Sequence, residues 1–535
     1  EIYNMKELKN DLASHQVFPK TNSDTEILLL SYLTFGADFV KKVDGIFAFA
    51  IYDERHNTLT LFRDSFGVKP LFYTMINGTI VFSSEPKGCF CFPGVKAELD
   101  VDGLNEILSL GPARTPGSGV FYGFHELLPG CYLTCSVFGR KMTQYFHLES
   151  RPHFDSYEET VEKTSFLIQD AIKRQMVSDV PICTFLSGGV DSSVVSAVCA
   201  AELKKQGKKL TTFSFDFIDN DKYFKANSFQ PSQDRPYVDK MVSFLDSDHH
   251  YLECDNKMQA DLLYRSVDAH DLPCMADIDS SLQYFCEEVS HSHKVVLTGE
   301  CADEVFGGYP WFHREEMLNS GTFPWTPSLT PRKVLLKDDL VKSLHMDEYV
   351  KKIYDRSVSE INVLPSENEI ETNRRRIGYL NIRFFMQTLL NRMDRTSMFS
   401  GLEARVPFAD RKLVDYVFNI PWEMKAKDGL VKNILRQASK GLLPDEILFR
   451  RKSPYPKTYN PYYENLLAKR LKEVLADSAS PLHSLLDLKQ VTQFLENPKD
   501  YGAPWYGQLM AGPQMIAYLL QIEYFLRKYN VSIRI

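Results

Sequence analysis

The first 150 residues alternate short apolar runs with polar turns. The apolar runs cover residues 46–52, 58–62 and 79–82, and turn-forming residues separate them at 53–57 and at Asn77-Gly78. Runs of this length, bounded by such turns, are typical of β-strands joined by hairpins. The pattern predicts a meandering antiparallel sheet that packs against another sheet or against helices.

A different pattern begins after Arg151-Pro152. Ser156 and Glu159 have the spacing of a capping box, and apolar residues at helical spacing continue to Met176. Apolar runs then alternate with helical segments, with strands expected at 182–186, 210–217 and 295–297 and a helix at 192–204. This alternation predicts a parallel α/β sheet with ligands at the carboxyl ends of its strands. Residues from 371 onward are expected to be mostly helical, and we place two domains at 1–150 and 151–535.

Composition narrows the function classes. A chain of 535 residues favours two or more domains, and 44% hydrophobic with 25% charged residues is ordinary for a globular protein. A net charge of -8 argues against a nucleic-acid-binding surface, and no apolar run approaches the length needed to span a membrane. The ten cysteines form no paired CxxC modules, which favours buried thiols in a reducing, cytoplasmic compartment.

One glycine-rich segment lies between a predicted strand and a predicted helix. It reads Ser187-Gly188-Gly189-Val190-Asp191-Ser192-Ser193. Its glycines allow close backbone approach, its N–H groups and hydroxyls suit an anion such as phosphate, and Asp191 suits a divalent cation. The Gly-Lys-Ser/Thr ending of a Walker loop is absent. The alternative interpretation is a strand-to-helix turn that merely requires glycine.

A second segment, 298–309, follows the strand predicted at 295–297. It places Glu300, Asp303 and Glu304 at the carboxyl end of that strand. Carboxylates crowded together need a cation or a positive ligand, which indicates Mg²⁺. The alternative is an acidic first turn of a helix, an interpretation that applies best to Glu304.

These two segments resemble known enzymes. The first resembles the pyrophosphate loop of ATP pyrophosphatases, which make adenylated intermediates. With the acidic segment and with 391–395, 401–408 and 449–456, the chain resembles glutamine-dependent asparagine synthetase of the bacterial B type over nearly its whole length. Three further segments resemble the glutaminase domain of that family: Glu1-Ile2-Tyr3-Asn4, Ser23-Asp24-Thr25-Glu26 and 63–71. At Arg63 and Asp64 we expect a buried ion pair that ties a turn.

The resemblance implies an α/β and α+β fold in two domains. The first would be a layered antiparallel-sheet glutaminase domain of the Ntn-hydrolase kind, with its front part missing. The second would be a parallel-sheet ATP pyrophosphatase (HUP-like) domain with a helical C-terminal part. The implied reaction adenylates the side chain of aspartate with ATP and amidates it with ammonia, which glutamine supplies in the full-length enzyme. Small-molecule substrates are the expected partners, and a homodimer is one open oligomeric state.

The resemblance also implies roles for individual residues. Glu300 would be the base that deprotonates ammonia, and Lys452 would contact the pyrophosphate. Asp191 and Asp303 would hold Mg²⁺, while Glu1 and Asp24 would bind glutamine. The implied ATP-binding residues are Leu186, Ser187, Gly188, Gly189, Asp191, Ser192, Ser193, Phe215, Thr298 and Gly299.

The chain departs from this family in three places. The family nucleophile is an amino-terminal cysteine, whereas this chain begins with Glu1 and its first cysteine is Cys89. We therefore expect a fragment that lacks the glutaminase step. The family commonly has Gly-Ser where this chain has Cys301-Ala302, and residues 271–281 differ from better-known members, so no aspartate-binding residue is assigned. Two alternatives stay open: a related adenylating amidotransferase, such as a β-lactam synthetase or the amidase partner of a peptide-modifying system, and a non-catalytic nucleotide-binding homologue.

Overall fold

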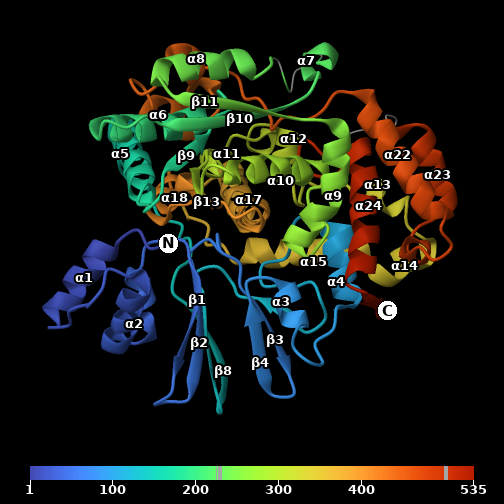
Figure 1. Ribbon diagram of the computed structural model, residues 1–535, viewed down its shortest axis with the longest axis horizontal. Helices are drawn as coiled ribbons and strands as arrows, with labels where there is room; N and C mark the ends of the chain where they lie inside the picture. Colours follow the sequence, from blue (N-terminus) through green and yellow to red (C-terminus); the bar gives the residue numbers. More distant parts are fainter. Residues whose placement is uncertain (225, 227–229, 231, 499–503) are drawn as a thin grey trace. The chain divides into compact units, whose positions relative to one another are not determined.

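The computed structural model describes residues 1–224, 226, 230, 232–498 and 504–535, which divide into two compact units (Figure 1). Unit 1 comprises Glu1–Val95, Pro116–Gly119 and Gly123–Glu149. Unit 2 comprises Lys96–Thr115, Val120–Tyr122 and Ser150–Ile535. The chain thus leaves unit 1 for good at Glu149, near the predicted boundary, while two earlier segments belong to unit 2.

Unit 1 contains two antiparallel sheets, the helices α1 (Met5–Ser14) and α2 (Asp24–Phe35), and the short helix α3 (Pro86–Phe90). The first sheet has the order β1-β2-β7-β8 and the second β4-β3-β6. Helices α1 and α2 pack through Leu8, Leu12 and Ile27 onto the first sheet, where Phe62 is fully buried. The strands are β1 (Ala48–Asp53), β2 (Thr58–Arg63), β3 (Phe72–Ile76), β4 (Thr79–Ser83), β6 (Phe124–Glu126), β7 (Cys131–Ser136) and β8 (Gly139–Gln144). The predicted meander of antiparallel strands is confirmed.

Arg63 and Asp64 hold a turn of unit 1, although not by pairing with each other as expected. The Arg63 guanidinium pairs with Glu126 at 2.8 Å and donates to the carbonyl oxygens of Gly67, Lys69 and Leu127. The Asp64 carboxylate accepts four backbone N–H groups, from residues 47, 66, 68 and 69. Both side chains are buried; backbone hydrogen bonds satisfy Asp64, and Glu126 together with backbone carbonyl oxygens satisfies Arg63.

Unit 2 contains a five-stranded parallel sheet in the order β11-β10-β9-β12-β13. Its strands are β9 (Ile182–Phe185), β10 (Thr211–Phe217), β11 (Asp248–Cys254), β12 (Val295–Leu297) and β13 (Glu403–Arg405). The central strand β9 pairs with β10 on one side and with β12 on the other. Cys183 of β9 aligns with Thr211 of β10 and with Val296 of β12. The loops that follow β9 and β12 therefore emerge side by side at one edge of the sheet.

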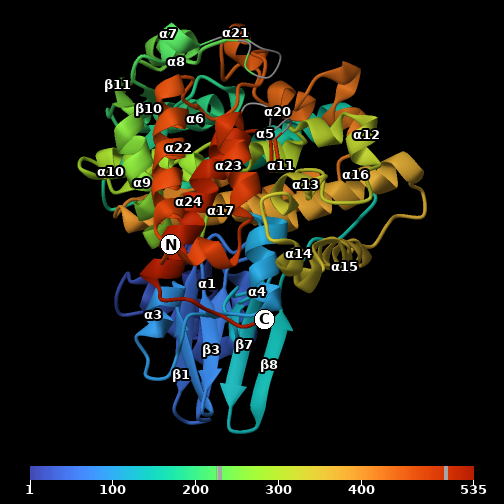
Figure 2. The same ribbon diagram turned by 90° about the vertical axis from the view of Figure 1, so that its right-hand side faces the viewer.

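Helices surround this sheet (Figure 1). Helix α5 (Tyr157–Gln175) begins with the predicted capping box between Ser156 and Glu159, and α6 (Val190–Lys205) follows β9 as expected. The C-terminal part is mostly helical, and Figure 2 shows α22, α23 and α24 running side by side. The larger helices after β10 are α8 (Arg235–Leu245), α9 (Asn256–His270), α10 (Asp277–Ser290), α14 (Asp338–Leu344), α15 (Met346–Ser359), α16 (Glu369–Leu380), α17 (Gln387–Phe399), α18 (Arg411–Phe418), α20 (Asn433–Ala438), α22 (Pro461–Ala476), α23 (Leu488–Glu496) and α24 (Gly512–Lys528).

The early segment of unit 2 is tied to residues far along the chain. Strand β5 (Glu98–Leu99) pairs in parallel with β14 (Ser532–Ile533). Beyond β5, the Asn105 amide donates to the carbonyl oxygen of Leu344 at 2.8 Å, and Tyr349 donates to the buried Glu106 carboxylate at 2.7 Å. These contacts explain why residues 96–115 belong to unit 2 although they precede the predicted boundary.

The predicted fold class, antiparallel sheets followed by a parallel sheet with a helical C-terminal part, is confirmed. Within the ranges that the structure describes, no helix combines the length and the apolar character needed to cross a membrane.

Candidate active site

The Ser187–Ser193 loop leaves the carboxyl end of β9 and enters α6. Ser192 Oγ accepts a hydrogen bond from the Ser187 backbone N–H at 3.1 Å and lies 3.0 Å from Ser187 Oγ, which closes the loop into a tight ring. Gly188 adopts φ +68°, and a Cβ there would lie 2.7 Å from Tyr237 Cβ, so both the conformation and the space require glycine. The loop thereby turns backbone N–H groups and the start of α6 toward one point, an arrangement that suits an anion.

Thr298 and Gly299, directly after β12, lie against this loop. A Cβ on Gly299 would lie only 2.6 Å from the backbone nitrogen of Ser192. Glycine is therefore needed for the two strand ends to approach each other. The close contact brings the predicted phosphate-binding loop and the acidic segment to one place.

Four charged side chains meet beside the loop. Lys432 Nζ lies 2.6 Å from Asp191 Oδ2 and 2.5 Å from Asp303 Oδ1, and Lys452 Nζ lies 2.5 Å from Asp303 Oδ2. Lys432 is almost completely buried, with a side chain 3% exposed. Gly308 packs directly against the cluster, where no side chain fits, because a Cβ there would lie 1.8 Å from Asp303 Oδ1 and 2.5 Å from Lys432 Cε. Two carboxylates and two ammonium groups thus alternate within one compact network.

The network sets the pKa values of its members. Burial raises the pKa of Asp303, but the ammonium groups of Lys432 and Lys452 outweigh burial and hold it below its usual range. Asp191 pairs with Lys432, but burial outweighs the effect of this ammonium group and raises the pKa of Asp191. For Lys432, burial lowers the pKa, but Asp191 and Asp303 together raise it above its usual value. Lys432 is therefore a permanent cation between the two carboxylates at neutral pH.

Glu300 is held by an arginine from a distant helix. Arg392 of α17 donates to Glu300 Oε1 at 2.7 Å, and its guanidinium lies 5.4 Å from the ring centroid of Tyr455. The Arg392 side chain is 6% exposed and that of Glu300 19% exposed. Glu300 consequently reaches the cavity with its carboxylate oriented by one fixed partner.

Glu304, next to Asp303, is buried and accepts a hydrogen bond from the Tyr309 hydroxyl. Burial and the neighbouring Asp303 charge raise the pKa of Glu304 to about 8. Its environment differs from that of Asp303, which contacts two lysines. The pKa values of these two neighbouring carboxyl groups are therefore shifted in opposite directions, down for Asp303 and up for Glu304.

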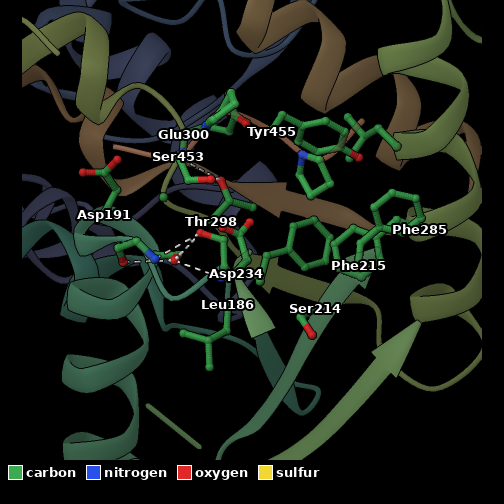
Figure 3. A pocket seen from close by; sticks show the side chains of 18 of the residues that line it. Leu186, Asp191, Ser214, Phe215, Asp234, Phe285, Thr298, Glu300, Ser453 and Tyr455 are labelled. Carbon is green, nitrogen blue, oxygen red and sulfur yellow. Dashed lines mark hydrogen bonds between the residues drawn. The ribbon is translucent and has the colours of Figure 1, made fainter. Parts of the chain in front are cut away.

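A cavity of about 270 Å³ opens over these groups. One wall is aromatic: Phe215 of β10 lies 5.6 Å from Phe285 and 6.3 Å from the stacked ring of Tyr455, between ring centroids. Figure 3 shows this wall on one side of the cavity, with Asp191 at the other end and Thr298 between them. An apolar wall opposite a charged end suits a ligand with one flat ring system and one anionic group.

Arg450 connects the loop to a neighbouring helix. Its guanidinium donates to the Ser187 carbonyl oxygen at 3.1 Å, pairs with Asp234 Oδ1 at 2.5 Å and lies 4.0 Å from the Tyr237 ring centroid. Burial raises the pKa of Asp234 despite this partner. Because Arg450 contacts the loop through the backbone of Ser187, it positions the loop while its own charge is already paired.

The structure brings most of the predicted ATP and metal residues to this cavity. The predicted residues that line it are Leu186, Ser187, Gly189, Asp191, Ser192, Phe215, Thr298, Gly299, Glu300, Asp303 and Lys452. Gly188 and Ser193 are buried and, in the part of the chain described, are not lining residues. Both instead shape the loop, Gly188 through its backbone and Ser193 through an N–H to the Gly189 carbonyl oxygen at 3.1 Å.

The predicted glutamine residues lie in unit 1. The Glu1 amino group donates to the Ile46 carbonyl oxygen at 2.8 Å, and a Cβ on Gly45 would lie 2.3 Å from the Glu1 carbonyl oxygen. Asp24 is the first residue of α2, where its carboxylate accepts the Thr25 N–H at 2.7 Å. Their role in glutamine binding stays a prediction.

Sequence reasoning missed Lys432, and gave no role to Arg392 or Arg450, although 391–395 and 449–456 had been singled out. A single lysine in a loop carries no pattern, and Lys432 contacts Asp191 across 241 positions. Arg392 and Glu300 are 92 positions apart. The signal for Arg392 was its place in the segment 391–395, but nothing in the surrounding sequence identified Glu300 as the acidic partner that a buried arginine needs.

One departure from the expected pattern has a structural counterpart. Cys301 adopts φ +73° at the start of α11 (Ala302–Phe306), a left-handed conformation that glycine adopts without strain. Its side chain is buried, at 2% exposure. A glycine would therefore adopt this backbone with less strain, whereas the cysteine side chain fills buried space beside the acidic segment.

Comparison with known proteins agrees with this geometry. A family model described as asparagine synthase matches residues 164–527, and one described as a glutamine amidotransferase domain matches residues 1–146. The second match gives no support to the expectation that the glutaminase step is absent from this chain.

Similar proteins extend over nearly the whole chain. Asparagine synthetase [glutamine-hydrolyzing] 3 of Bacillus subtilis is 48% identical over 537 residues, which cover 100% of this chain and 87% of the relative. Asparagine synthetase [glutamine-hydrolyzing] 1 of the same organism is 28% identical, covering 93% and 80%. Amidase chyE of Penicillium rubens is 28% identical, covering 85% and 75%. Taken with the loop, the paired carboxylates and the cavity, these matches show that the chain belongs to the asparagine synthase family.

Proposed function

We propose that this chain is an asparagine synthetase. It activates the side-chain carboxylate of aspartate with ATP, giving β-aspartyl-AMP and pyrophosphate, and then transfers ammonia to give asparagine and AMP. The observation that carries the proposal is the Asp191–Lys432–Asp303–Lys452 network beside the Ser187–Ser193 loop, at the charged end of a cavity with an aromatic wall. In domain terms, we assign 1–150 to glutamine use and 151–535 to synthesis.

The first step overcomes the poor reactivity of a carboxylate. A carboxylate oxygen of aspartate attacks the α-phosphorus of ATP, and the bond from that phosphorus to the bridging oxygen breaks, so that pyrophosphate leaves. Negative charge accumulates on the leaving group, where the loop N–H groups, the Ser187 and Ser192 hydroxyls and Lys452 would stabilise it. Phe215 and Tyr455 would stack on the adenine, with Leu186 and Gly299 beside the ribose.

The residues present suit a divalent cation. Within the described chain, Asp191 Oδ1 is buried without a hydrogen-bond partner, and carboxylate oxygens are the ligands that Mg²⁺ prefers. Asp191 and Asp303 would hold the ion. Bound Mg²⁺ would neutralise phosphate charge and so favour displacement at phosphorus.

Lysine placement separates two tasks. Lys432 is buried between the two carboxylates, so its positive charge reduces their mutual repulsion and orients them before the nucleotide binds. Lys452 is more exposed, with a side chain 22% exposed, and lies on the cavity wall with its Nζ 4.1 Å from the Tyr309 ring centroid. We assign Lys452 to the pyrophosphate and Lys432 to the protein side of the site.

Glu300 would serve the second step. The ammonia nitrogen attacks the acyl carbon of β-aspartyl-AMP, the bond to the phosphate-bearing oxygen breaks, and AMP leaves. The nitrogen must lose a proton, and the Glu300 carboxylate, which lines the cavity and is oriented by Arg392, would accept it. Arg392 fixes the direction of that carboxylate, and its removal would leave Glu300 without its partner.

Ammonia would come from glutamine through the amidotransferase domain. The match to residues 1–146 and the placement of Glu1 and Asp24 in unit 1 support glutamine binding there. We propose that both residues contact the glutamine substrate.

The test measures pyrophosphate release and asparagine formation separately. We expect Glu300→Gln to retain ATP binding and to lose asparagine formation with free ammonia by about 100-fold or more, the size of a lost general base. Glu315→Gln, an exposed carboxylate at the start of α12 (Glu315–Leu318), is the matched control. Normal asparagine formation by Glu300→Gln would refute the assignment of the base. Pyrophosphate release with another carboxylic acid but not with aspartate would refute the substrate and would favour a different adenylating ligase.

A further inference from the structure

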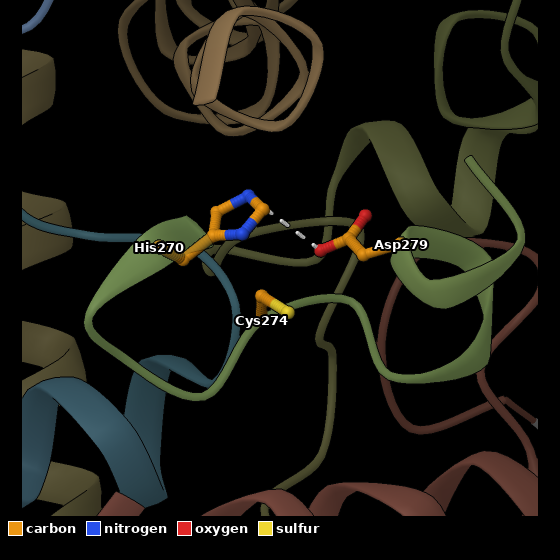
Figure 4. Close-up of side chains that lie close together, drawn as sticks. All are labelled: His270, Cys274 and Asp279. Atoms are coloured by element: carbon orange, nitrogen blue, oxygen red, sulfur yellow. Dashed lines mark ion pairs between the residues drawn. The ribbon is translucent and has the colours of Figure 1, made fainter. Parts of the chain in front are cut away.

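A mixed cluster of potential metal ligands lies between α9 and α10, apart from the network just described. It consists of His270, the last residue of α9, Cys274 in the connecting loop and Asp279 in the first turn of α10. One potential ligand atom of each residue lies within 4.8 Å of those of the other two. Figure 4 shows the imidazole, the sulfur and the carboxylate turned toward a common centre.

These separations are close to what a small cation requires. His270 Nε2 lies 3.9 Å from Asp279 Oδ2. For tetrahedral Zn²⁺, bond lengths of about 2.0–2.3 Å place neighbouring ligand atoms roughly 3.3–3.8 Å apart. Side-chain movements of less than about 1 Å would therefore bring all three atoms into a coordination shell.

The imidazole already presents a lone pair to the cluster. His270 Nδ1 lies 2.8 Å from the Ser266 carbonyl oxygen, and because a carbonyl only accepts, Nδ1 carries the proton. Nε2 is then unprotonated, and among the described residues it has no hydrogen-bond partner although the side chain is only 10% exposed. A ligating histidine bound through its other nitrogen to a backbone carbonyl is the usual arrangement at metal sites.

Cys274 Sγ and the Asp279 carboxylate also accept hydrogen bonds from neighbouring groups. The Gln521 amide of α24 donates to Cys274 Sγ at 3.1 Å and to Ser266 Oγ at 3.0 Å, and such a donor stabilises a thiolate. The Met275 N–H donates to Asp279 Oδ2 at 2.6 Å, which fixes the carboxylate. Each ligand therefore has an outer partner that orients it.

We propose that His270, Cys274 and Asp279 bind one Zn²⁺ ion through Nε2, Sγ and a carboxylate oxygen. The nitrogen, sulfur and oxygen set is one that Zn²⁺ accepts, whereas Mg²⁺ selects oxygen ligands alone. On binding, the Cys274 thiol loses its proton to solvent as the Zn–S bond forms. Three protein ligands leave the fourth tetrahedral position for water.

The ion would fasten the loop that connects α9 to α10. Met275, which lies in that loop next to Cys274, is a lining residue of the nucleotide cavity. Asp279 also contributes its charge to the surroundings of Arg392, the partner of Glu300. The zinc site thus stabilises one wall of the cavity, and the zinc ligands themselves take no part in the reaction.

The test uses the purified chain, stripped of metal and kept reduced. Zn²⁺ affinity is measured by competition with a chromogenic chelator, and Co²⁺ serves as a spectroscopic probe because a bound thiolate produces a sulfur-to-cobalt charge-transfer band. We expect one Zn²⁺ per chain, and a loss of affinity of at least about 100-fold in Cys274→Ser and His270→Gln, since even outer-shell changes cost 10- to 100-fold. Cys286→Ser, an equally buried cysteine of α10, is the matched control and should bind as the unmodified chain does.

Thermal unfolding provides a second readout. Zn²⁺ should raise the midpoint of the unmodified chain and of Cys286→Ser, because it binds the folded state, but not that of Cys274→Ser. Circular dichroism checks that each variant folds, and if Cys274→Ser does not fold, His270→Gln decides. A cobalt band that survives in these variants, or no charge-transfer band in the unmodified chain, overturns the proposal.

Discussion

Replacing Lys432 with methionine removes the central cation of the site and keeps the volume of its side chain. Lys432 is 3% exposed and makes two ion pairs, at 2.6 Å to Asp191 and 2.5 Å to Asp303. In the variant, both carboxylates stay largely enclosed, with side chains 23% (Asp191) and 19% (Asp303) exposed, and of the two Asp303 alone keeps a partner, Lys452. The substitution therefore creates an uncompensated buried charge instead of merely deleting a contact.

The expected cost is about 3–5 kcal/mol, the usual effect of removing one member of a buried ion pair. For a unit of this size, 1 kcal/mol shifts the unfolding midpoint by roughly 1–2 °C, so the midpoint should fall by about 3–10 °C. Protonation of Asp191 limits the loss, because its pKa is already raised by burial. Mg²⁺ should recover more stability in the variant than in the unmodified chain, since a cation replaces the missing charge.

The assay is thermal unfolding with and without Mg²⁺, combined with aspartate-dependent pyrophosphate release. Lys440→Met, an exposed lysine shortly after α20, is the control and should stay within about 0.5 kcal/mol of the unmodified chain. Lys432→Arg keeps the charge and should lose less stability than Lys432→Met. If Lys432→Met unfolds within about 1 °C of the unmodified chain and releases pyrophosphate normally, the network does not carry the role argued from its geometry.

Two further predictions concern the same edge of the sheet. The pKa of Glu304 is about 8 in the folded chain, against an ordinary glutamate pKa of 4.5 in the unfolded chain. Between these two pH values the folded state retains a proton that the unfolded state releases, so stability falls as pH rises. Glu304→Gln, which still accepts from Tyr309, should flatten this decline by up to about 1.4 kcal/mol per pH unit, measured as midpoints across a pH series; an unchanged slope would contradict it. Gly299→Ala places a Cβ 2.6 Å from the Ser192 nitrogen and must displace the loop. The kcat/KM for ATP should therefore fall by about 10- to 100-fold, and the overpacking should cost about 1–3 kcal/mol of stability. Unaltered kinetics would show that the loop adapts.

Local patterns predicted the elements that carry the chemistry. The apolar run before Ser187, the paired glycines and the helix after them gave the correct order of strand, loop and helix, with β9 ending at Phe185 and α6 beginning at Val190. The capping box at Ser156 predicted the start of α5 correctly. These features depend on neighbours within one or two turns, which is the range over which propensity and hydrogen bonding act.

Features that depend on distant residues escaped prediction. Strand β13 is as short as β12, but Glu403 and Arg405 are charged, so it lacks an apolar run that would reveal it, and its place in the sheet depends on its alignment with β12. Lys432 sits in a loop whose own sequence indicates only solvent exposure, yet two carboxylates from elsewhere enclose it. The zinc ligands likewise converge only once α9 and α10 have packed against each other.

The pairing of β5 with β14 has a consequence for how the protein is made. Arg534, directly after β14, contacts Glu98 of β5 across 436 positions of the chain. At a synthesis rate of about 5–20 residues per second, β5 emerges roughly 20–90 s before its partner. Throughout that time its backbone edge is open to other strands. This part of unit 2 therefore cannot form until residues 532–533 have been synthesised, long after residues 98–99.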